Sequence, residues 1–167
     1  MKKNVTLIGM PGAGKSTVGV VLAKILGFEF IDSDLEIQRE EGRLLWQIIE
    51  SEGREGFWKV EERVNASLNP EQTVIATGGS VIYGPKAMEH LRQISTVVYL
   101  HHDYEVIASR LGDLAERGVT LPEGWTLRDL YKERTPMYEK YAHLVFHSNA
   151  DDIRGTAIEL AACLRRM

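Results

Sequence analysis

The chain has 167 residues, of which 44% are hydrophobic and 26% are charged, and its formal net charge is −4. This length predicts one domain, residues 1–167, with a substantial core and no room for a second domain of similar size. The acidic balance argues against a broadly basic surface that binds nucleic acid.

Short apolar segments alternate with helical patterns along the chain. The expected strands cover residues 5–9, 28–32, 73–77, 95–100 and 143–147. The helical patterns cover residues 16–26, 34–42, 44–53, 54–68, 86–93, 103–111 and 151–166. Strands with few polar residues, separated by helices, predict an α/β fold in which helices cover both faces of a parallel sheet.

The stretch "GMPGAGKST", residues 9–17, stands between the first expected strand and the first expected helix. It matches the phosphate-loop pattern, in which glycines let backbone N–H groups wrap closely around a triphosphate. The start of the following helix adds positive potential. Lys15 is expected to reach the β and γ phosphates of ATP, and Ser16 to offer its hydroxyl to Mg²⁺. The expected ATP-binding residues of this loop are Gly12, Ala13, Gly14, Lys15, Ser16 and Thr17.

Two carboxylates follow the second expected strand in "FIDSD", at Asp32 and Asp34. Residues two apart in an extended chain point the same way, and ligands of such sheets bind at the carboxyl ends of strands. Asp32 is therefore a candidate metal ligand. Asp34 is a candidate catalytic group that accepts a proton or hydrogen bond from an attacking hydroxyl. The alternative is that Asp34 or Ser33 only caps the next helix.

Other features of the sequence suggest a lid loop and a cellular compartment. Residues 112–125 contain three glycines and one proline without clear periodicity, which is typical of a functional loop. The single cysteine, Cys163, cannot form a disulfide within the chain and lies in an amphipathic helical pattern. No segment approaches the ~20 apolar residues of a membrane span. We expect a cytoplasmic monomer without nucleic-acid or membrane partners.

Six segments occur together in the order and near the spacing of one known family. They are "GMPGAGKST", "FIDSD", "ESEGREGFWKVEE", "IATGGS", "ASRL" and "ERTPMYEKYA". Over most of its length the chain resembles shikimate kinase, a small phosphate-loop kinase. The resemblance implies a three-layer α/β/α fold with a five-stranded parallel sheet in order 2-3-1-4-5, a lid loop at about 112–125 and an acceptor-binding helical region at about 33–67.

The same resemblance implies an activity and several residue roles. The reaction would transfer the γ-phosphoryl group of ATP to a hydroxyl of shikimate, giving shikimate 3-phosphate for aromatic amino-acid biosynthesis. By resemblance, Asp34 binds the substrate hydroxyls and Asp32 supports magnesium. Gly78 and Gly79 lie against the substrate ring, and Arg134 grips its carboxylate.

Two further arginines resemble residues on the nucleotide side. Arg110 resembles an arginine that lies over the adenine, and Arg117 would be the lid arginine that closes on the phosphates and takes part in catalysis. The lid context departs from the family, which usually continues Arg-Pro-Leu where this chain has Arg117-Gly118-Val119. Each arginine could instead be a solvated surface residue.

The acceptor side departs more strongly from the family. Trp58 stands where the family usually has the second arginine that clamps the substrate carboxylate, and Ser80 stands where it usually has a third glycine. A tryptophan cannot replace a bidentate arginine. Arg54, one helical turn earlier, could reach toward the pocket or could pair with Glu50 or Glu61. Trp58 itself could form a flat wall of the acceptor pocket or pack in the core.

Three other functions stay open on the residues alone. A related kinase could phosphorylate a polyol or sugar without a carboxylate, which would explain the changes in the acceptor pocket. A regulatory module could bind nucleotide without phosphotransfer, although it would not need Asp34. A nucleoside monophosphate kinase is disfavoured, because the chain lacks the several arginines that such enzymes place around a second nucleotide.

Overall fold

A five-stranded parallel sheet forms the centre of the molecule in the computed structural model, which describes residues 2–112, 119 and 121–167. The strands run in the order β2-β3-β1-β4-β5, as predicted. They are β1 (Asn4–Ile8), β2 (Glu29–Asp32), β3 (Thr73–Ala76), β4 (Ser95–Leu100) and β5 (Leu144–Phe146). Every residue of β1, β3 and β4 is buried, because helices cover both faces of the sheet.

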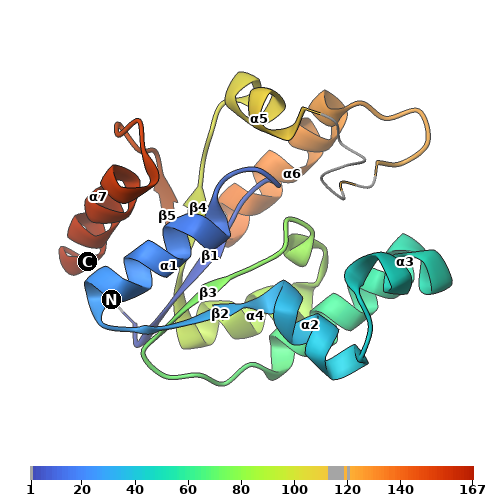
Figure 1. Cartoon of the computed structure of the whole chain (residues 1–167), viewed down its shortest axis with the longest axis horizontal. Helices are drawn as coiled ribbons and strands as arrows, with labels where there is room; N and C mark the ends of the chain where they lie inside the picture. Colours follow the sequence, from blue (N-terminus) through green and yellow to red (C-terminus); the bar gives the residue numbers. More distant parts are fainter. Residues whose placement is uncertain (1, 113–118, 120) are drawn as a thin grey trace.

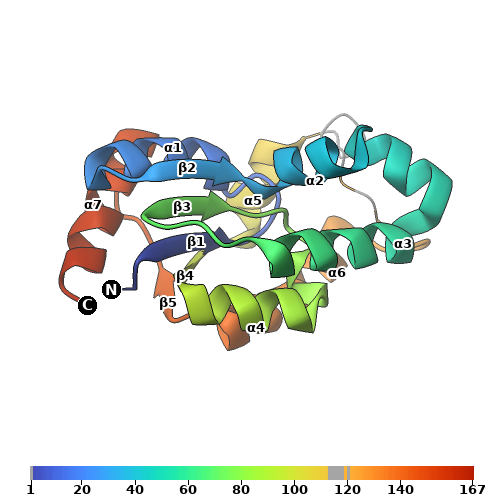
Figure 2. The same ribbon diagram turned by 90° about the horizontal axis from the view of Figure 1, so that it is seen from below.

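Helices form a layer on each side of this sheet (Figure 2). On one face, α1 (Lys15–Leu26) packs along α7 (Ile153–Arg165). The opposite face carries α4 (Pro85–Ile94), against which the second half of α3 (Leu45–Ser67) packs. The main core fills both interfaces and includes Leu7, Leu22, Met88, Val98 and Leu160. The predicted three-layer arrangement is confirmed.

The helices α2 (Ser33–Glu41) and α3 extend beyond the carboxyl ends of the strands (Figure 1). They enclose a second, smaller core built on Ile37, Ile48, Phe57 and Val64. Within α3, Gly53 has φ 72° and ψ 178°, so the helix breaks there. This break corresponds to the boundary between the two helical patterns expected at 44–53 and 54–68.

Two elements of the structure were not expected from the sequence. The helix α6 (Leu127–Tyr141) contains Pro136, and its charged composition hides the apolar stripe. Its start carries a capping box, in which the Thr126 and Asp129 side chains bond each other's backbone N–H groups; this pattern could have revealed the helix. A short 3₁₀ turn, η1 (Val81–Tyr83), follows β3.

The segment from α5 (Tyr104–Leu111) to α6 contains the predicted lid. Residues 113–118 and 120, with Arg117 among them, lie outside the described residues. Val119 lines the cavity described below. No helix of the described residues has both the length and the apolar character needed to cross a membrane.

Candidate functional site

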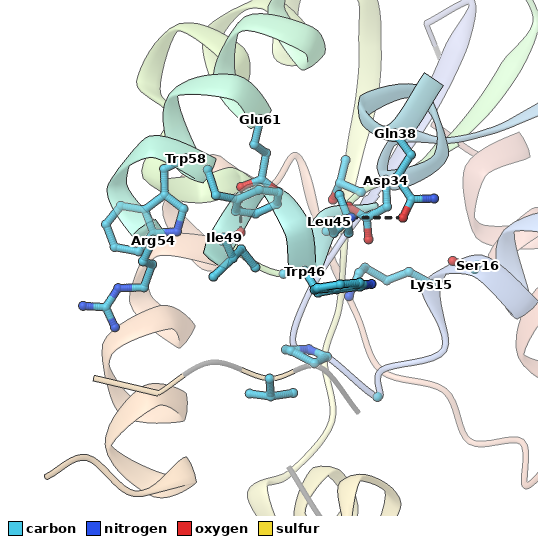
Figure 3. A pocket seen from close by; sticks show the side chains of 18 of the residues that line it. Lys15, Ser16, Asp34, Gln38, Leu45, Trp46, Ile49, Arg54, Trp58 and Glu61 are labelled. Carbon is cyan, nitrogen blue, oxygen red and sulfur yellow. Dashed lines mark hydrogen bonds between the residues drawn. The ribbon is translucent and has the colours of Figure 1, made fainter. Parts of the chain in front are cut away.

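A cavity of about 910 Å³ opens at the carboxyl ends of the strands. Its walls come from the loop after β1, from α2 and α3, from the turn after β3, and from α6. Figure 3 shows that Lys15 and Ser16 lie at one end of this space, whereas Arg54, Trp58 and Glu61 come from α3 at the other. The nucleotide motif and the predicted acceptor residues therefore share one cavity.

The loop of residues 9–14 is shaped by glycines in the left-handed region of backbone space. Gly12 and Gly14 have φ values of 79° and 85°. A Cβ on Gly9, whose φ is 150°, would also lie 2.9 Å from the Leu100 carbonyl oxygen. Gly14 precedes α1 without a side-chain cap. The start of the helix therefore keeps the positive potential that favours a phosphate group.

Lys15 lies inside the curve of this loop. Its Nζ donates hydrogen bonds of 2.8 Å to the carbonyl oxygens of Gly9 and Met10. Burial lowers the pKa of the Lys15 ammonium to about 8, and the nearby Asp34 carboxylate opposes part of that shift. A buried ammonium whose partners in the described part of the chain are two carbonyl oxygens is suited to bind a phosphate oxygen.

Side chains after β4 support the loop from the other side. His102 Nε2 lies 3.0 Å from the Ala13 carbonyl oxygen, and Arg110 donates to the Gly12 carbonyl oxygen at 3.1 Å. Arg110 is thus anchored to the phosphate loop, and its predicted contact with adenine is not tested by these contacts. Thr17 donates to the Gly14 carbonyl oxygen at 3.1 Å, at the first turn of α1.

Asp32 connects β2 to the phosphate loop. Its Oδ2 accepts a hydrogen bond of 2.8 Å from Ser16 Oγ, and its Oδ1 accepts one of 3.0 Å from the Asp34 backbone N–H. Asp32 is therefore the cap of α2, so the alternative in which Ser33 or Asp34 only caps this helix is wrong. The Ser16 hydroxyl and the Asp32 carboxylate together form a hard oxygen donor set of the kind that Mg²⁺ prefers.

Asp34 reaches the cavity by a different geometry from the one expected. Because α2 already begins at Ser33, Asp34 lies in the first helical turn rather than in an extended chain. Burial, and then the neighbouring Asp32 carboxylate, raise the pKa of Asp34 to about 6, against the opposing effect of Lys15. A carboxylate near that pKa can accept a proton from a hydroxyl at neutral pH.

The turn after β3 leaves little space for side chains at Gly78 and Gly79. A Cβ on Gly78 would lie 2.8 Å from both Asp34 Oδ1 and Glu61 Oε2. A Cβ on Gly79 would lie 2.9 Å from Pro11 Cδ and 3.0 Å from an Arg134 guanidinium nitrogen. A larger residue at either position would therefore displace Asp34, Glu61, Pro11 or Arg134 from its present place.

Arg134 is a buried cation of α6. Its side chain is 6% exposed, and its Nε donates to the Tyr83 hydroxyl at 3.3 Å. Tyr138, one turn further along α6, bonds the Gly79 carbonyl oxygen at 2.6 Å. Among the described residues Arg134 makes no ion pair with a carboxylate. A buried guanidinium without a counter-charge favours an anionic ligand.

Trp58 combines the two interpretations that the sequence left open. It lines the cavity and also packs against the smaller core. Its ring stacks on Tyr83, with centroids 4.2 Å apart and an interplanar angle of 23°. Tyr83 had no signal in the sequence, since it comes from the short turn η1.

Arg54 does not occupy the place of the missing clamp. Its guanidinium carbon lies 5.3 Å from the centroid of the Trp58 ring, and Figure 3 shows the side chain extending away from Asp34 and Lys15. Within the described part of the chain it forms no ion pair with Glu50 or Glu61. Arg54 therefore lines the cavity, as one alternative allowed, whereas the alternative pairing with Glu50 or Glu61 is not seen among the described residues.

Comparisons with known proteins agree with this geometry. The family model described as shikimate kinase matches residues 11–165. A shikimate kinase of Acinetobacter baylyi is 39% identical over 167 residues, covering 98% of this chain and 91% of its own. A shikimate kinase of Histophilus somni is 40% identical over 149 residues, which cover 86% of this chain and 85% of the relative.

Solved structures show the same likeness. The shikimate kinase of Acinetobacter baumannii in complex with shikimate superposes with a TM-score of 0.88 at 36% identity, covering 99% of this chain and 94% of its own. The shikimate kinase of Aquifex aeolicus superposes with a TM-score of 0.83 at 31% identity, and the match covers 97% of this chain and 96% of that one. A gluconokinase of Sinorhizobium meliloti shares the fold alone. Its TM-score is 0.57 at 19% identity, and the match covers 99% of this chain and 94% of that one.

Proposed function

The chain belongs to the shikimate kinase family, and we propose that it phosphorylates shikimate between its phosphate loop and Asp34. It is an ATP-dependent kinase, and its acceptor is a small molecule. The observation that carries the assignment of the site is that Lys15, Asp34 and Arg134 line one cavity. Lys15 suits a triphosphate, Asp34 suits a hydroxyl nucleophile, and Arg134 suits an acceptor carboxylate.

The proposed reaction is an in-line displacement at the γ-phosphorus of ATP. The acceptor hydroxyl attacks phosphorus, the bond to the bridging oxygen of ADP breaks, and the hydroxyl proton passes to the Asp34 carboxylate. Lys15 and the N–H groups of residues 12–17 stabilise the charge on the transferring group. Arg110 donates to the Gly12 carbonyl oxygen at 3.1 Å, and its contact with the adenine stays a prediction.

Ser16 and Asp32 are the residues that would hold Mg²⁺, directly or through water. The Ser16 Oγ and Asp32 Oδ2 atoms lie 2.8 Å apart, where β2 meets the phosphate loop. When bound, the ion would neutralise charge on the phosphate oxygens. Ser16 and Asp32 then position the nucleotide tail against Lys15, so that removal of Mg²⁺ with a chelator is expected to abolish turnover.

The acceptor would lie between α2, the glycine turn and α6. Asp34 binds its hydroxyls, Gly78 and Gly79 give its ring a close approach to the backbone, and Arg134 binds its carboxylate. Trp58 provides a flat wall beside Tyr83. Arg117 and the loop about 112–125 would close over the phosphates and exclude water, which limits wasteful hydrolysis of ATP.

The assay that tests this function couples ADP release to an optical signal with shikimate as the variable substrate. We expect saturable, Mg²⁺-dependent turnover with shikimate. Because Trp58 replaces an arginine, the same assay should include polyols and sugars without a carboxylate. Efficient turnover of such a compound together with none of shikimate would replace the proposed acceptor, and nucleotide binding without any turnover would favour a regulatory module.

We also propose that the chain acts as a monomer with a single kinase domain in the cytoplasm. Composition supports the compartment, since a single cysteine suits a reducing environment, and a net charge of −4 argues against a polyanionic partner. The length of 167 residues supports a single domain. Light scattering at several concentrations tests the oligomeric state. A mass that doubles with concentration would contradict the monomer.

A further inference from the structure

Tyr83 is an aromatic residue beside the acceptor end that the mechanism above leaves without a role. It belongs to η1, the short turn that follows the two glycines after β3, and η1 packs against both α3 and α6. Its side chain is partly buried behind the residues that line the cavity. Tyr83 therefore stands between the helix that carries Trp58 and the helix that carries Arg134.

The ring of Tyr83 is held on the side of α3. It stacks on the Trp58 ring, with centroids 4.2 Å apart and an interplanar angle of 23°. The Arg54 guanidinium carbon lies 5.3 Å from the centroid of the same Trp58 ring. Figure 3 shows Trp58 and Arg54 together on α3, at the end of the cavity far from Ser16. Because stacked aromatic rings attract each other, Trp58 fixes the plane in which the Tyr83 ring lies.

The hydroxyl of Tyr83 is held on the side of α6 by two consecutive residues. It donates a hydrogen bond to the Glu133 carboxylate and accepts one of 3.3 Å from Arg134 Nε. Burial, and then the bond to Glu133, raise the pKa of the Tyr83 hydroxyl, so it stays protonated at neutral pH. A hydroxyl has one proton to donate. Donation to Glu133 therefore leaves the lone pairs of the oxygen for Arg134.

These contacts decide which edge of the Arg134 guanidinium a ligand can use. Tyr83 occupies Nε, and the guanidinium carbon lies 5.3 Å from the centroid of the Tyr83 ring. One terminal nitrogen lies 3.0 Å from the position that a Cβ on Gly79 would take, where the turn borders the cavity. A guanidinium binds a carboxylate through two parallel N–H groups. With Nε occupied, these two groups are those of the terminal nitrogens.

We propose that Tyr83 is a positioning residue, which holds Arg134 so that its two terminal nitrogens face the acceptor carboxylate. The inference rests on the proposed function, since the anion that it invokes is that of shikimate. An arginine that is free to move loses rotamer freedom when it binds, whereas an arginine already held in place loses less. The stack of Trp58 on Tyr83 would thus offset part of the loss of the second arginine, because it improves the orientation of Arg134.

The main test is steady-state kinetics with shikimate and ATP on the unaltered chain and on Tyr83→Phe. This variant keeps the ring and its stack on Trp58, but it removes the oxygen that accepts from Arg134 Nε. We expect the KM for shikimate to rise about three- to tenfold. The kcat and the KM for ATP should stay unchanged, because Tyr83 contacts neither the phosphate loop nor Asp34.

Tyr131→Phe is the matched control. The Tyr131 hydroxyl also makes a hydrogen bond, which it donates to the His102 carbonyl oxygen at 2.8 Å, after β4. The change in the side chain is the same, and Tyr131 lies on α6 as Arg134 does. Since this bond does not involve Arg134, the KM for shikimate should not change.

A second background separates positioning from general packing. Lysine has no N–H group at the place of Nε, so in Arg134→Lys the Tyr83 hydroxyl has lost the group that it holds. Adding Tyr83→Phe to Arg134→Lys should therefore weaken shikimate binding no further. For this pair of variants the Kd for shikimate is measured by calorimetry, so that slow turnover does not prevent the comparison.

The outcomes separate this inference from the proposed function. Turnover of shikimate with an unchanged acceptor KM in Tyr83→Phe would overturn the role of Tyr83 alone. An equal rise in the KM for ATP, or the same rise in Tyr131→Phe, would also overturn it. So would a further loss of shikimate binding when Tyr83→Phe is added to Arg134→Lys. No turnover of shikimate by the unaltered chain would overturn the proposed function and this inference with it.

Discussion

The two ends of the cavity are built in different ways. The nucleotide end is built mainly from backbone groups. Gly12 and Gly14 adopt left-handed conformations, and among the described residues Lys15 donates only to carbonyl oxygens. At the acceptor end, side chains from separate elements meet. Asp34 comes from α2, Glu61 from α3 and Arg134 from α6.

This difference explains where the chain departs from its family pattern. A backbone cradle tolerates little change, because each glycine is required by its own torsion angle or by a neighbour. A pocket of side chains can exchange one charge arrangement for another, provided that buried groups stay paired. Here Trp58 removes a cation, and Ser80 supplies a hydrogen bond to the acid that remains.

The largest expected effect comes from the residue at which both ends meet. Asp34→Asn keeps the shape of the side chain but removes its ability to accept a proton. We expect kcat to fall about 10²–10⁴-fold, while the KM for ATP changes little because the phosphate loop is untouched. Coupled assays and nucleotide titration measure the two quantities. Unchanged turnover would mean that Asp34 is not the acceptor of the proton.

A second variant acts on the acceptor end alone. Arg134→Ala removes the buried guanidinium, and we expect kcat/KM for shikimate to fall by about 2–5 kcal/mol in free-energy terms. Arg134→Lys should recover only part of this, since an ammonium cannot form the bidentate contact. Nucleotide affinity is the control, measured by calorimetry. An equal loss of ATP binding would contradict the division of the cavity into two ends.

The pH dependence of kcat/KM for shikimate tests the electrostatics of Asp34. Burial and Asp32 raise its pKa to about 6, and only the ionised form accepts a proton. As the pH falls through about 6, kcat/KM should therefore fall, approaching tenfold per pH unit. The residual activity of Asp34→Asn should lack this acidic limb, and a limb that persists there would assign it to another group.

The division between the two ends also explains what the sequence could predict. The strands follow from local patterns and their order follows from the family resemblance, and both are confirmed. The phosphate loop also follows from a local pattern, and the structure places it between β1 and α1. The position of Asp34 was expected from an extended chain, but Asp32 caps α2 and the helix starts one residue earlier than that argument needs. Side-chain direction depends on such boundaries, which are the least reliable part of a sequence pattern.

The acceptor end could not be predicted in the same way, because it is built by contacts between segments that are distant in the sequence. Ser80 was noted only as a departure from three glycines, and its bond to Glu61 joins residues 19 positions apart. The stacking of Trp58 on Tyr83 joins α3 to η1, and α6 was missed because Pro136 and charged residues obscure its pattern. No local period encodes pairings of this kind. The roles of the site residues remain predictions.

A more modest change tests how well the acceptor end is adapted to its tryptophan. Trp58→Arg restores the cation that the family usually has, and we expect the KM for shikimate to fall about tenfold, equivalent to about 1.4 kcal/mol of binding. Loss of the Tyr83 stack should lower the free energy of unfolding by about 1 kcal/mol. A KM that stays the same or rises would show that the pocket is fitted to Trp58 and Glu61 as they stand.

The smallest expected effect on turnover concerns the break in α3. Gly53, with φ 72° and ψ 178°, occupies a backbone region that is almost closed to other residues, although a Cβ there would meet no atom of the described residues within 4 Å. Gly53→Ala should therefore lower the free energy of unfolding by about 1–3 kcal/mol, measured by urea denaturation. Any change in the path of α3 would move Trp58 and Glu61, so the KM for shikimate should rise while that for ATP does not.

Gly27→Ala is the matched control for this variant. Gly27 ends α1, has φ 71° and also has nothing within 4 Å of a Cβ, but it lies on the opposite side of the sheet from α3. It should lose stability without any change in the KM for shikimate. If both variants altered that KM equally, the effect would come from general destabilisation, and the break at Gly53 would have no particular part in shaping the acceptor end.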